Sequence, residues 1–108
     1  MKALLITPYG EKFVQEVEVK DWRDIAPLIG CRIFTTVRIS QNDYVYVDDE
    51  GLYSGVAEEH GAFQIDTYDH PLMGKGLVLG TGPDGESIDP EITVEELEKR
   101  LTRMMVLG

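Results

Sequence analysis

The sequence predicts an α+β fold, a mainly antiparallel sheet of about five or six short strands with one short internal helix and a C-terminal amphipathic helix. Short apolar or alternating segments recur along the chain and are separated by turn residues, as in antiparallel sheets. Only two segments carry helix-boundary signals, and those of the C-terminal segment are the clearer. The 108 residues, 43% hydrophobic and 28% charged, have ordinary globular composition. We therefore expect a single domain over residues 1–108.

The first two strands are expected to form a hairpin. Lys2–Thr7 contains four consecutive apolar residues, which suits a strand covered on both faces. The sequence Pro-Tyr-Gly at 8–10 favours a turn, and Lys12–Lys20 then alternates apolar and charged residues. Such alternation is typical of a half-buried strand, and the short turn favours pairing with the strand before it.

The internal helix is predicted over Asp21–Ile29. Pro27 is tolerated only near the start of a helix, because it lacks an N–H and its ring clashes with the preceding turn. With Asp24 as the N-cap, Pro27 falls in the first turn. Gly30 then supplies the residue that commonly ends a helix.

In residues 31–75, the types and alternation of the residues predict the secondary structure. Cys31–Ile39 alternates, a polar turn follows, and Tyr44–Val47 is rich in aromatic and β-branched residues, so two further strands are expected. Residues 54–75 have the weakest pattern. They are expected to hold a helical turn near Val56–His60 and a short strand at Phe63–Tyr68.

The C-terminal part combines a strand, a turn and the clearest helix signal. Residues 76–80 contain a short apolar run that predicts a covered strand. Residues 80–85 match G-x-G-x-x-G in letters, but Pro83 and Asp84 favour a hairpin turn over a phosphate-binding loop. Thr93 and Glu96 are spaced as a capping box. The apolar stripe at helical spacing that follows is Val94, Leu97, Leu101 and Met104.

Charge is distributed unevenly along the chain. The net charge is −10, and residues 39–74 carry eight Asp or Glu with no Lys or Arg. Such a stretch disfavours direct binding to nucleic acid or an anionic membrane, since both require cations on the protein. It favours a basic partner, although a solvated acidic face explains the same composition.

Aromatic residues lie among these carboxylates, and the combination suits binding of Arg and Lys side chains through cation–π contacts and charge-assisted hydrogen bonds. Packing on the sheet is the alternative role for the tyrosines. The predicted binding residues are Asp43, Tyr44, Tyr46, Asp48, Asp49, Glu50, Tyr53, Glu58, Glu59, Asp66 and Asp69.

Catalytic signals are weak. The single cysteine, Cys31, cannot form an internal disulfide or a zinc-binding cysteine cluster. His60, His70 and Asp66 offer metal-ligand or acid–base chemistry, but the ten-residue separation of the histidines fits no helical ligand pair. We expect no cofactor and no enzymatic activity, with a metal-dependent enzyme as an alternative. No targeting segment is apparent, which predicts a cytoplasmic location.

Several short segments of the sequence resemble the domain of unknown function 3846 family. The resemblance rests on Met1–Ile6 followed by Pro8, Val47–Leu52, Met73–Gly74 leading into Gly76–Gly80, and Ile92–Thr93 followed by Glu95 and Glu96. It implies a small accessory protein of a kind frequent in phage and other mobile-element genomes, as well as in bacteria and archaea. It supplies no catalytic residues, and residues 60–71 depart from the pattern.

Two functional hypotheses follow. The first is a non-enzymatic accessory protein whose acidic segment binds a basic protein surface, in one form by mimicking the DNA of a host or defence protein. The second is a protein that sequesters a small molecule or signalling nucleotide, because cations outside the acidic segment could line a separate pocket. Those cations are Lys12, Arg23, Arg32, Arg38 and Lys75. The sequence leaves the oligomeric state open.

Overall fold

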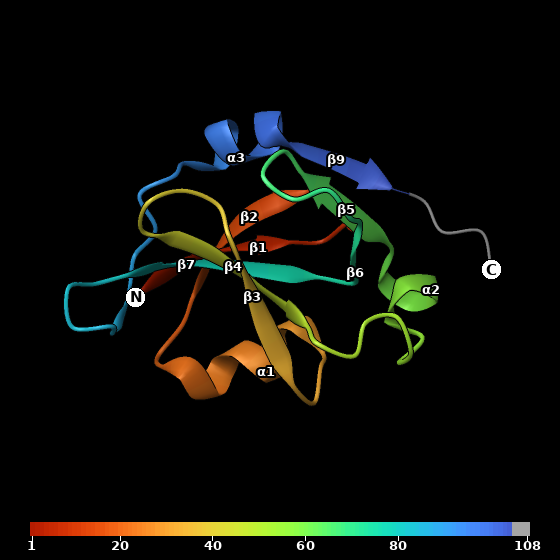
Figure 1. The fold of residues 1–108 in the computed structure, drawn as a ribbon, viewed down its shortest axis with the longest axis horizontal. Helices are drawn as coiled ribbons and strands as arrows, with labels where there is room; N and C mark the ends of the chain where they lie inside the picture. Colours follow the sequence, from red (N-terminus) through yellow and green to blue (C-terminus); the bar gives the residue numbers. More distant parts are fainter. Residues whose placement is uncertain (105–108) are drawn as a thin grey trace.

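The computed structural model describes residues 1–104, which form nine strands and four short helical segments (Figure 1). The elements in chain order are β1 (Lys2–Ile6), β2 (Val14–Glu18), η1 (Trp22–Asp24), α1 (Ile25–Ile29), β3 (Phe34–Arg38), β4 (Asp43–Asp48), α2 (Val56–His60), β5 (Ala62–Ile65), β6 (Leu72–Met73), β7 (Gly76–Thr81), β8 (Ser87–Ile88), α3 (Val94–Arg100) and β9 (Leu101–Met104). The predicted α+β class is confirmed.

The strands form two antiparallel sheets. The larger sheet has the order β2-β1-β7-β4-β3, and β8 pairs with the end of β7. The smaller sheet has the order β6-β5-β9. The interior positions of β1 and β7 in the sheet match their apolar sequences, since a strand flanked by neighbours and covered on both faces buries nearly all of its side chains; only Lys2 and Thr81 are half-buried. In the larger sheet, β2 and β3 are the edge strands.

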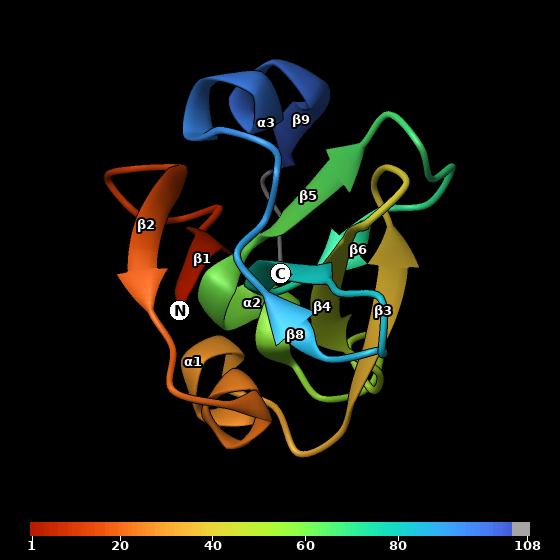
Figure 2. The same cartoon turned by 90° about the vertical axis from the view of Figure 1, so that its left-hand side faces the viewer.

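Two apolar cores lie on opposite faces of the larger sheet. Helix α1 covers one face, while α3 and the smaller sheet lie over the other (Figures 1 and 2). The core on the side of the smaller sheet contains Leu4, Ile6, Val14, Ile39, Val45, Val47, Phe63, Ile65, Leu72, Val78, Ile92, Leu97 and Leu101. The core on the α1 side contains Ala3, Leu5, Val19, Ile25, Ile29, Leu77 and Leu79.

The pleat of β4 shows how alternation divides side chains between the two cores. Val45 and Val47 enter the core on the side of the smaller sheet. Tyr46 points to the α1 side and makes an edge-to-face contact with Phe34, with ring centroids 5.4 Å apart. Successive side chains of a strand point to opposite faces, so this register places part of the aromatic content inside the protein.

The ends of helix α1 follow the predicted signals, with one difference at its start. Gly30 has a φ of 70° and its N–H donates to the carbonyl of Ala26, so it ends the helix in the left-handed conformation that glycine favours. Asp24 occupies the N-cap position but its carboxylate makes no capping bond. It accepts from the N–H of Lys20 instead, at 2.8 Å.

The C-terminal segment begins as predicted and ends differently. Thr93 and Glu96 form both bonds of the capping box, each 3.1 Å long. The helix stops at Arg100, and Leu101–Met104 is strand β9, paired with β5. Leu101 therefore belongs to strand β9 rather than to a further helical turn, and its side chain is buried there. Within residues 1–104, no helix is long and apolar enough to cross a membrane.

Candidate functional site: a groove beside the free edge of β3

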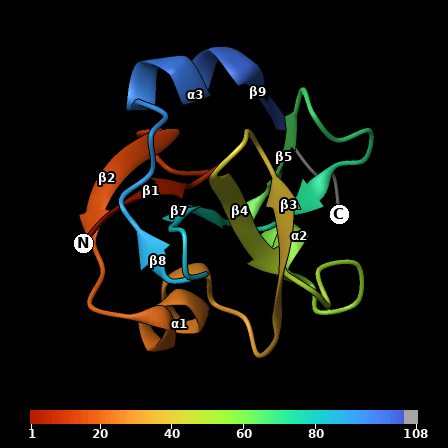
Figure 3. The same cartoon turned by 60° about the vertical axis from the view of Figure 1, so that its left-hand side comes forward.

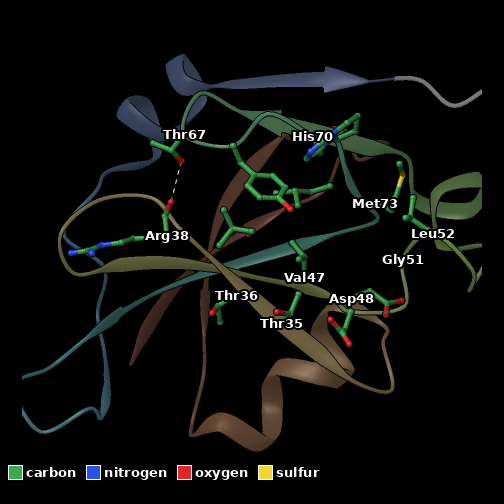
Figure 4. A pocket seen from close by; sticks show the side chains of 15 residues that line it. Thr35, Thr36, Arg38, Val47, Asp48, Gly51, Leu52, Thr67, His70 and Met73 are labelled. Atoms are coloured by element: carbon green, nitrogen blue, oxygen red, sulfur yellow. Dashed lines mark hydrogen bonds between the residues drawn. The ribbon is translucent and has the colours of Figure 1, made fainter.

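An open groove of about 800 Å³ separates β3 from β6 and the loop before it (Figure 4). This size lies within the usual range of ligand pockets, about 300–1,000 Å³. Val47 and Leu72, both buried, give it an apolar floor. The residues that line this β3–β6 groove are Thr35, Thr36, Val37, Arg38, Val47, Asp48, Asp49, Gly51, Leu52, Thr67, Tyr68, His70, Pro71, Leu72 and Met73.

Hydrogen bonds at the two ends of β3 establish which backbone groups face β4. The N–H of Ile39 donates to the carbonyl of Asp43, and the N–H of Asp49 donates to the carbonyl of Ile33, both at 2.9 Å. In an antiparallel ladder, directly bonded pairs alternate with pairs whose backbone groups point outward. Every second residue of β3 between these ends therefore faces away from β4.

The outward-facing residues of β3 are Phe34, Thr36 and Arg38. The carbonyl of Arg38 accepts a bond from the hydroxyl of Thr67 at 3.0 Å, which closes one end of the edge (Figure 4). The outward N–H and C=O groups of Phe34 and Thr36 have no hydrogen-bond partner within residues 1–104. The groove thus lies beside a short free strand edge.

Asp43 is a structural residue. Its carboxylate is completely buried and accepts the N–H groups of Glu91, at 3.0 and 3.1 Å, and Ile92, at 2.9 Å. These contacts hold the chain that leads into α3 against the start of β4. The side chain is therefore not available to a partner, although the sequence placed it in the predicted binding set.

Asp48 also acts within the protein. Its carboxylate accepts the N–H of Glu50 at 2.8 Å and the hydroxyl of Ser54 at 3.1 Å. These bonds shape the turn after β4, and the side chain is 9% exposed. Asp48 still lines one end of the groove.

Two further carboxylates of the acidic segment are paired with arginines from outside it. Glu50 binds Arg32, with a shortest contact of 2.6 Å, and the hydrogen bond from the guanidinium lowers the pKa of Glu50. Asp66 binds Arg100 through Nε at 3.0 Å and through Nη2 at 2.9 Å. Arg100 also donates to the carbonyl of Ile39. The eight carboxylates therefore do not form one uncompensated surface.

The remaining four carboxylates are exposed and lie in three places. Asp49 lines the groove, whereas Asp69, on the adjacent loop between the groove residues Tyr68 and His70, lines a neighbouring pocket with Lys99 and Arg100. Glu58 and Glu59 are on α2, where Glu59 lies 3.8 Å from Nε2 of His60. Within residues 1–104, neither Asp49 nor Asp69 forms an ion pair.

The tyrosines of the acidic segment also divide between the interior and the surface of the protein. Tyr46 packs on the α1 side and Tyr44 is half-buried, whereas Tyr53 is 89% exposed. Tyr68 lines the groove and its ring makes an edge-to-face contact with His70 at 5.7 Å.

The predicted binding set did not include Thr35, Thr36 or Leu52, the last of which is 74% exposed in the groove lining. For the threonines, the available signal was a β-branched segment without charge, which indicates a strand but not a free edge. Leu52 lay in a predicted turn, where a single apolar residue carries no specific meaning.

A second, smaller pocket of about 550 Å³ lies beside the turn after β1. It brings together Lys12 and Lys75, two of the cations considered for anion binding, with His60, and Glu11 and Glu59 also line it. His60 and His70 therefore belong to different pockets. Over residues 1–104, no group of three or more His, Cys, Asp or Glu side chains is arranged to hold a metal ion.

Cys31 is half-buried against the α1-side core. Burial raises the pKa of its thiol, and the negative charge of Asp48 raises it further. A raised pKa keeps the thiol protonated at neutral pH, which is the opposite of what a nucleophilic cysteine requires.

Comparisons with known proteins place the chain in a family. Residues 1–102 match the family described as "Domain of unknown function (DUF3846)". The chain is 35% identical over 99 residues to "Uncharacterized protein y4iR" of Sinorhizobium fredii (strain NBRC 101917 / NGR234), an alignment covering 87% of this chain and 58% of that relative. The chain thus spans less than two thirds of the relative's length. No solved structure matches it. With a family match that extends over nearly all the strands and helices, the chain belongs to the family of the domain of unknown function DUF3846.

Proposed function

We propose that this protein is a small, acidic, non-enzymatic accessory protein that binds a basic segment of another protein in the β3–β6 groove. The observation that carries the proposal is the combination of an apolar floor, a free strand edge and the unpaired carboxylate of Asp49 in the lining of one groove, with the unpaired Asp69 on the adjacent loop. A cytoplasmic location and a phage or mobile-element origin are parts of the same proposal.

Because several of its acidic residues are paired or buried, this protein is better suited to bind a partner in a groove than across an extended anionic surface. A protein that mimics DNA needs closely spaced free charges, because its partner binds regularly spaced phosphates. Glu50 and Asp66 are neutralised by arginines, and Asp43 is buried. Recognition by a few carboxylates around an apolar groove fits this distribution better than mimicry of a duplex.

The first test uses a short fluorescent peptide in which lysine and valine alternate, and a second peptide with glutamate in place of lysine. Fluorescence anisotropy should show binding of the lysine peptide only. The affinity should fall when NaCl rises from about 0.05 M to about 0.5 M, because salt screens exposed charges. Absence of lysine-peptide binding, or equal binding of the glutamate peptide, would reject the proposed function.

Two charge-matched variants locate the interaction. In Asp49→Asn/Asp69→Asn, the carboxylate in the groove lining and the one on the adjacent loop are neutralised, and lysine-peptide affinity should fall about fivefold, because the negative potential around the groove is reduced. Glu95→Gln/Glu98→Gln removes the same charge from exposed positions on α3 and should change affinity much less. Equal losses in both variants would show that net charge, not the groove, attracts the peptide.

A second candidate function is binding of a small anionic molecule in the pocket that contains Lys12 and Lys75. The specific observation in its favour is the convergence of two lysines from separate parts of the chain, while Glu11 and Glu59 at the same pocket oppose it. A ligand that binds the folded state raises the melting temperature. A nucleotide that stabilises the protein but not the Lys12→Gln/Lys75→Gln variant would support this function, and no stabilisation by any nucleotide would count against it.

A further inference from the structure

We infer that the segment in the groove binds by adding a strand to the outer edge of β3. This inference rests on the proposed function and specifies how the partner is held and which sequence pattern it carries. It begins from the contrast between the two edges of the larger sheet.

The edge at β2 is protected. Its exposed residues include Glu16 and Glu18, and α3 contacts the strand. Charged side chains and covering helices are common devices that prevent another chain from pairing with a sheet edge. A partner strand would have to displace or desolvate these groups, so β2 is a poor acceptor.

The edge at β3 lacks those devices over most of its length. Thr35 and Thr36 are uncharged and exposed, and Val37 is half-buried. The one charged side chain of the strand, Arg38, folds back onto the following turn, where Nε donates to the carbonyl of Ser40 at 3.0 Å and Nη2 to that of Gln41 at 2.9 Å. Figure 3 shows β3 at the outer side of the larger sheet, next to β4.

The free backbone groups define where the added strand pairs. Phe34 and Thr36 each offer an outward N–H and C=O, and Arg38 offers an outward N–H. The bond from Thr67 to the carbonyl of Arg38 ends the edge at that side. A strand of about four or five residues would satisfy these groups, a length typical of short strands.

The pleat predicts the partner's sequence pattern. Residues opposite Thr35 and Val37 share their face and point into the groove, over Val47 and Leu72. These positions favour apolar side chains. The alternate positions point away from the groove toward solvent, where the negative potential of the protein favours lysine or arginine.

Charge also favours a basic partner over a second copy of this chain. Two copies paired through β3 would bring together molecules that each carry a net charge of −10. Asp49 lines the groove in each copy, so part of this repulsion would be concentrated at the contact. A basic, alternating segment of another protein would instead be attracted to this negatively charged site.

The first experiment tests main-chain pairing with the lysine–valine peptide on the unaltered protein. Two N-methylated versions are compared, one methylated at every lysine amide and the other at every valine amide. In a β-ladder only one of these sets faces β3, so methylation of that set should weaken binding at least about tenfold, because donors are lost and the methyl groups clash with the edge.

The direction of the added strand follows from which of the two N-methylated peptides binds more weakly. In an antiparallel arrangement the lysine amides face β3, and in a parallel arrangement the valine amides do. Either asymmetry supports strand addition. Equal affinity of the two methylated peptides would overturn it, while unmethylated-peptide binding that still depends on salt and on Asp49 would leave the proposed function standing.

The second experiment alters the protein. Because the N–H of Thr36 faces outward, Thr36→Pro removes a donor from the free edge and preserves the bonds to β4, a position where strands tolerate proline. Lysine-peptide affinity should fall at least about tenfold. Thr36→Val, which keeps the N–H, is the matched control and should bind normally.

Circular dichroism and sedimentation complete the test. A Thr36→Pro variant that is folded and binds like the unaltered protein would overturn strand addition. If that variant does not fold, the methylated peptides still decide the question. A dimer of the unaltered protein that is lost in Thr36→Pro, together with no peptide binding, would identify a second copy as the occupant and overturn the inference.

Discussion

At the residue scale, the same side-chain type serves opposite purposes in this protein. Asp43 and Asp48 lie within one strand and share the chemistry of Asp49, yet only Asp49 is exposed. A buried carboxylate is costly unless hydrogen bonds replace its water, and converging backbone N–H groups do so for Asp43. Composition therefore predicts how many negative charges exist, whereas local donors decide which of them face solvent.

The role of Asp43 leads to a stability prediction. Asp43→Asn replaces a charged acceptor by a neutral amide with only one oxygen, so the N–H groups of Glu91 and Ile92 lose bonding partners. We expect the free energy of unfolding to fall by about 2 kcal/mol or more, measured by urea denaturation. Asp49→Asn, the same substitution at an exposed position, should change it by less than about 0.5 kcal/mol. Equal effects would contradict the structural role of Asp43.

At the scale of elements, residue-specific cap signals located helix boundaries better than apolar spacing did. The capping box at Thr93 and Glu96 and the stop at Gly30 are local features, and both were predicted from the sequence. Leu101–Met104 continued the helical apolar spacing, yet it forms β9. Pairing with β5 satisfies the backbone groups of this segment and Leu101 is buried there, so tertiary pairing overrides the local helical spacing.

The capping box gives a pH-dependent prediction. The backbone and side chain of Thr93 hydrogen-bond the Glu96 carboxylate and lower its pKa. A lowered folded-state pKa contributes stability above the unfolded pKa, and that contribution is lost as the pH falls through the folded pKa. Thr93→Ala should cost about 1 kcal/mol at neutral pH, measured by urea denaturation.

Acid titration provides the control for this prediction. The difference in unfolding free energy between Thr93→Ala and the unaltered protein should shrink at a pH where Glu96 is protonated, because the Thr93 side chain that lowers the pKa of Glu96 is absent from the variant, whereas the backbone N–H of residue 93 is present in both proteins. Thr102→Ala, at an exposed threonine of β9, should show no comparable pH dependence of its difference. A Thr93→Ala difference that stays constant or grows in acid would contradict the assignment.

At the scale of the whole molecule, negative charge opposes the folded state. The net charge is −10, and folding brings like charges closer together than in the unfolded chain. The exposed ion pairs, such as Arg32 with Glu50, offset little of this repulsion. Salt should therefore act on this protein mainly by screening repulsion.

We expect about 0.5 M NaCl to stabilise the protein by on the order of 1 kcal/mol, seen as a rise in melting temperature of about 4–8 °C. The gain should be smaller in Glu95→Gln/Glu98→Gln, which starts with two fewer negative charges. Potassium chloride at the same ionic strength should act equally, since screening does not depend on the identity of the cation. A melting temperature that falls with salt would mean that attractive ion pairs dominate.

The amino-acid pattern alone indicates the α+β class, the alternation of the main strands, both helix signals and the excess of negative charge. These features depend on neighbours a few residues away, which a single chain displays directly. The burial of Asp43 depends on long-range contacts, since the N–H of Glu91 that it binds lies 48 positions along the chain. The groove, the free edge of β3 and the separation of His60 from His70 likewise arise where distant strands meet. Local periodicity specifies the type of an element, but the choice of its neighbours depends on how all the apolar faces are buried together.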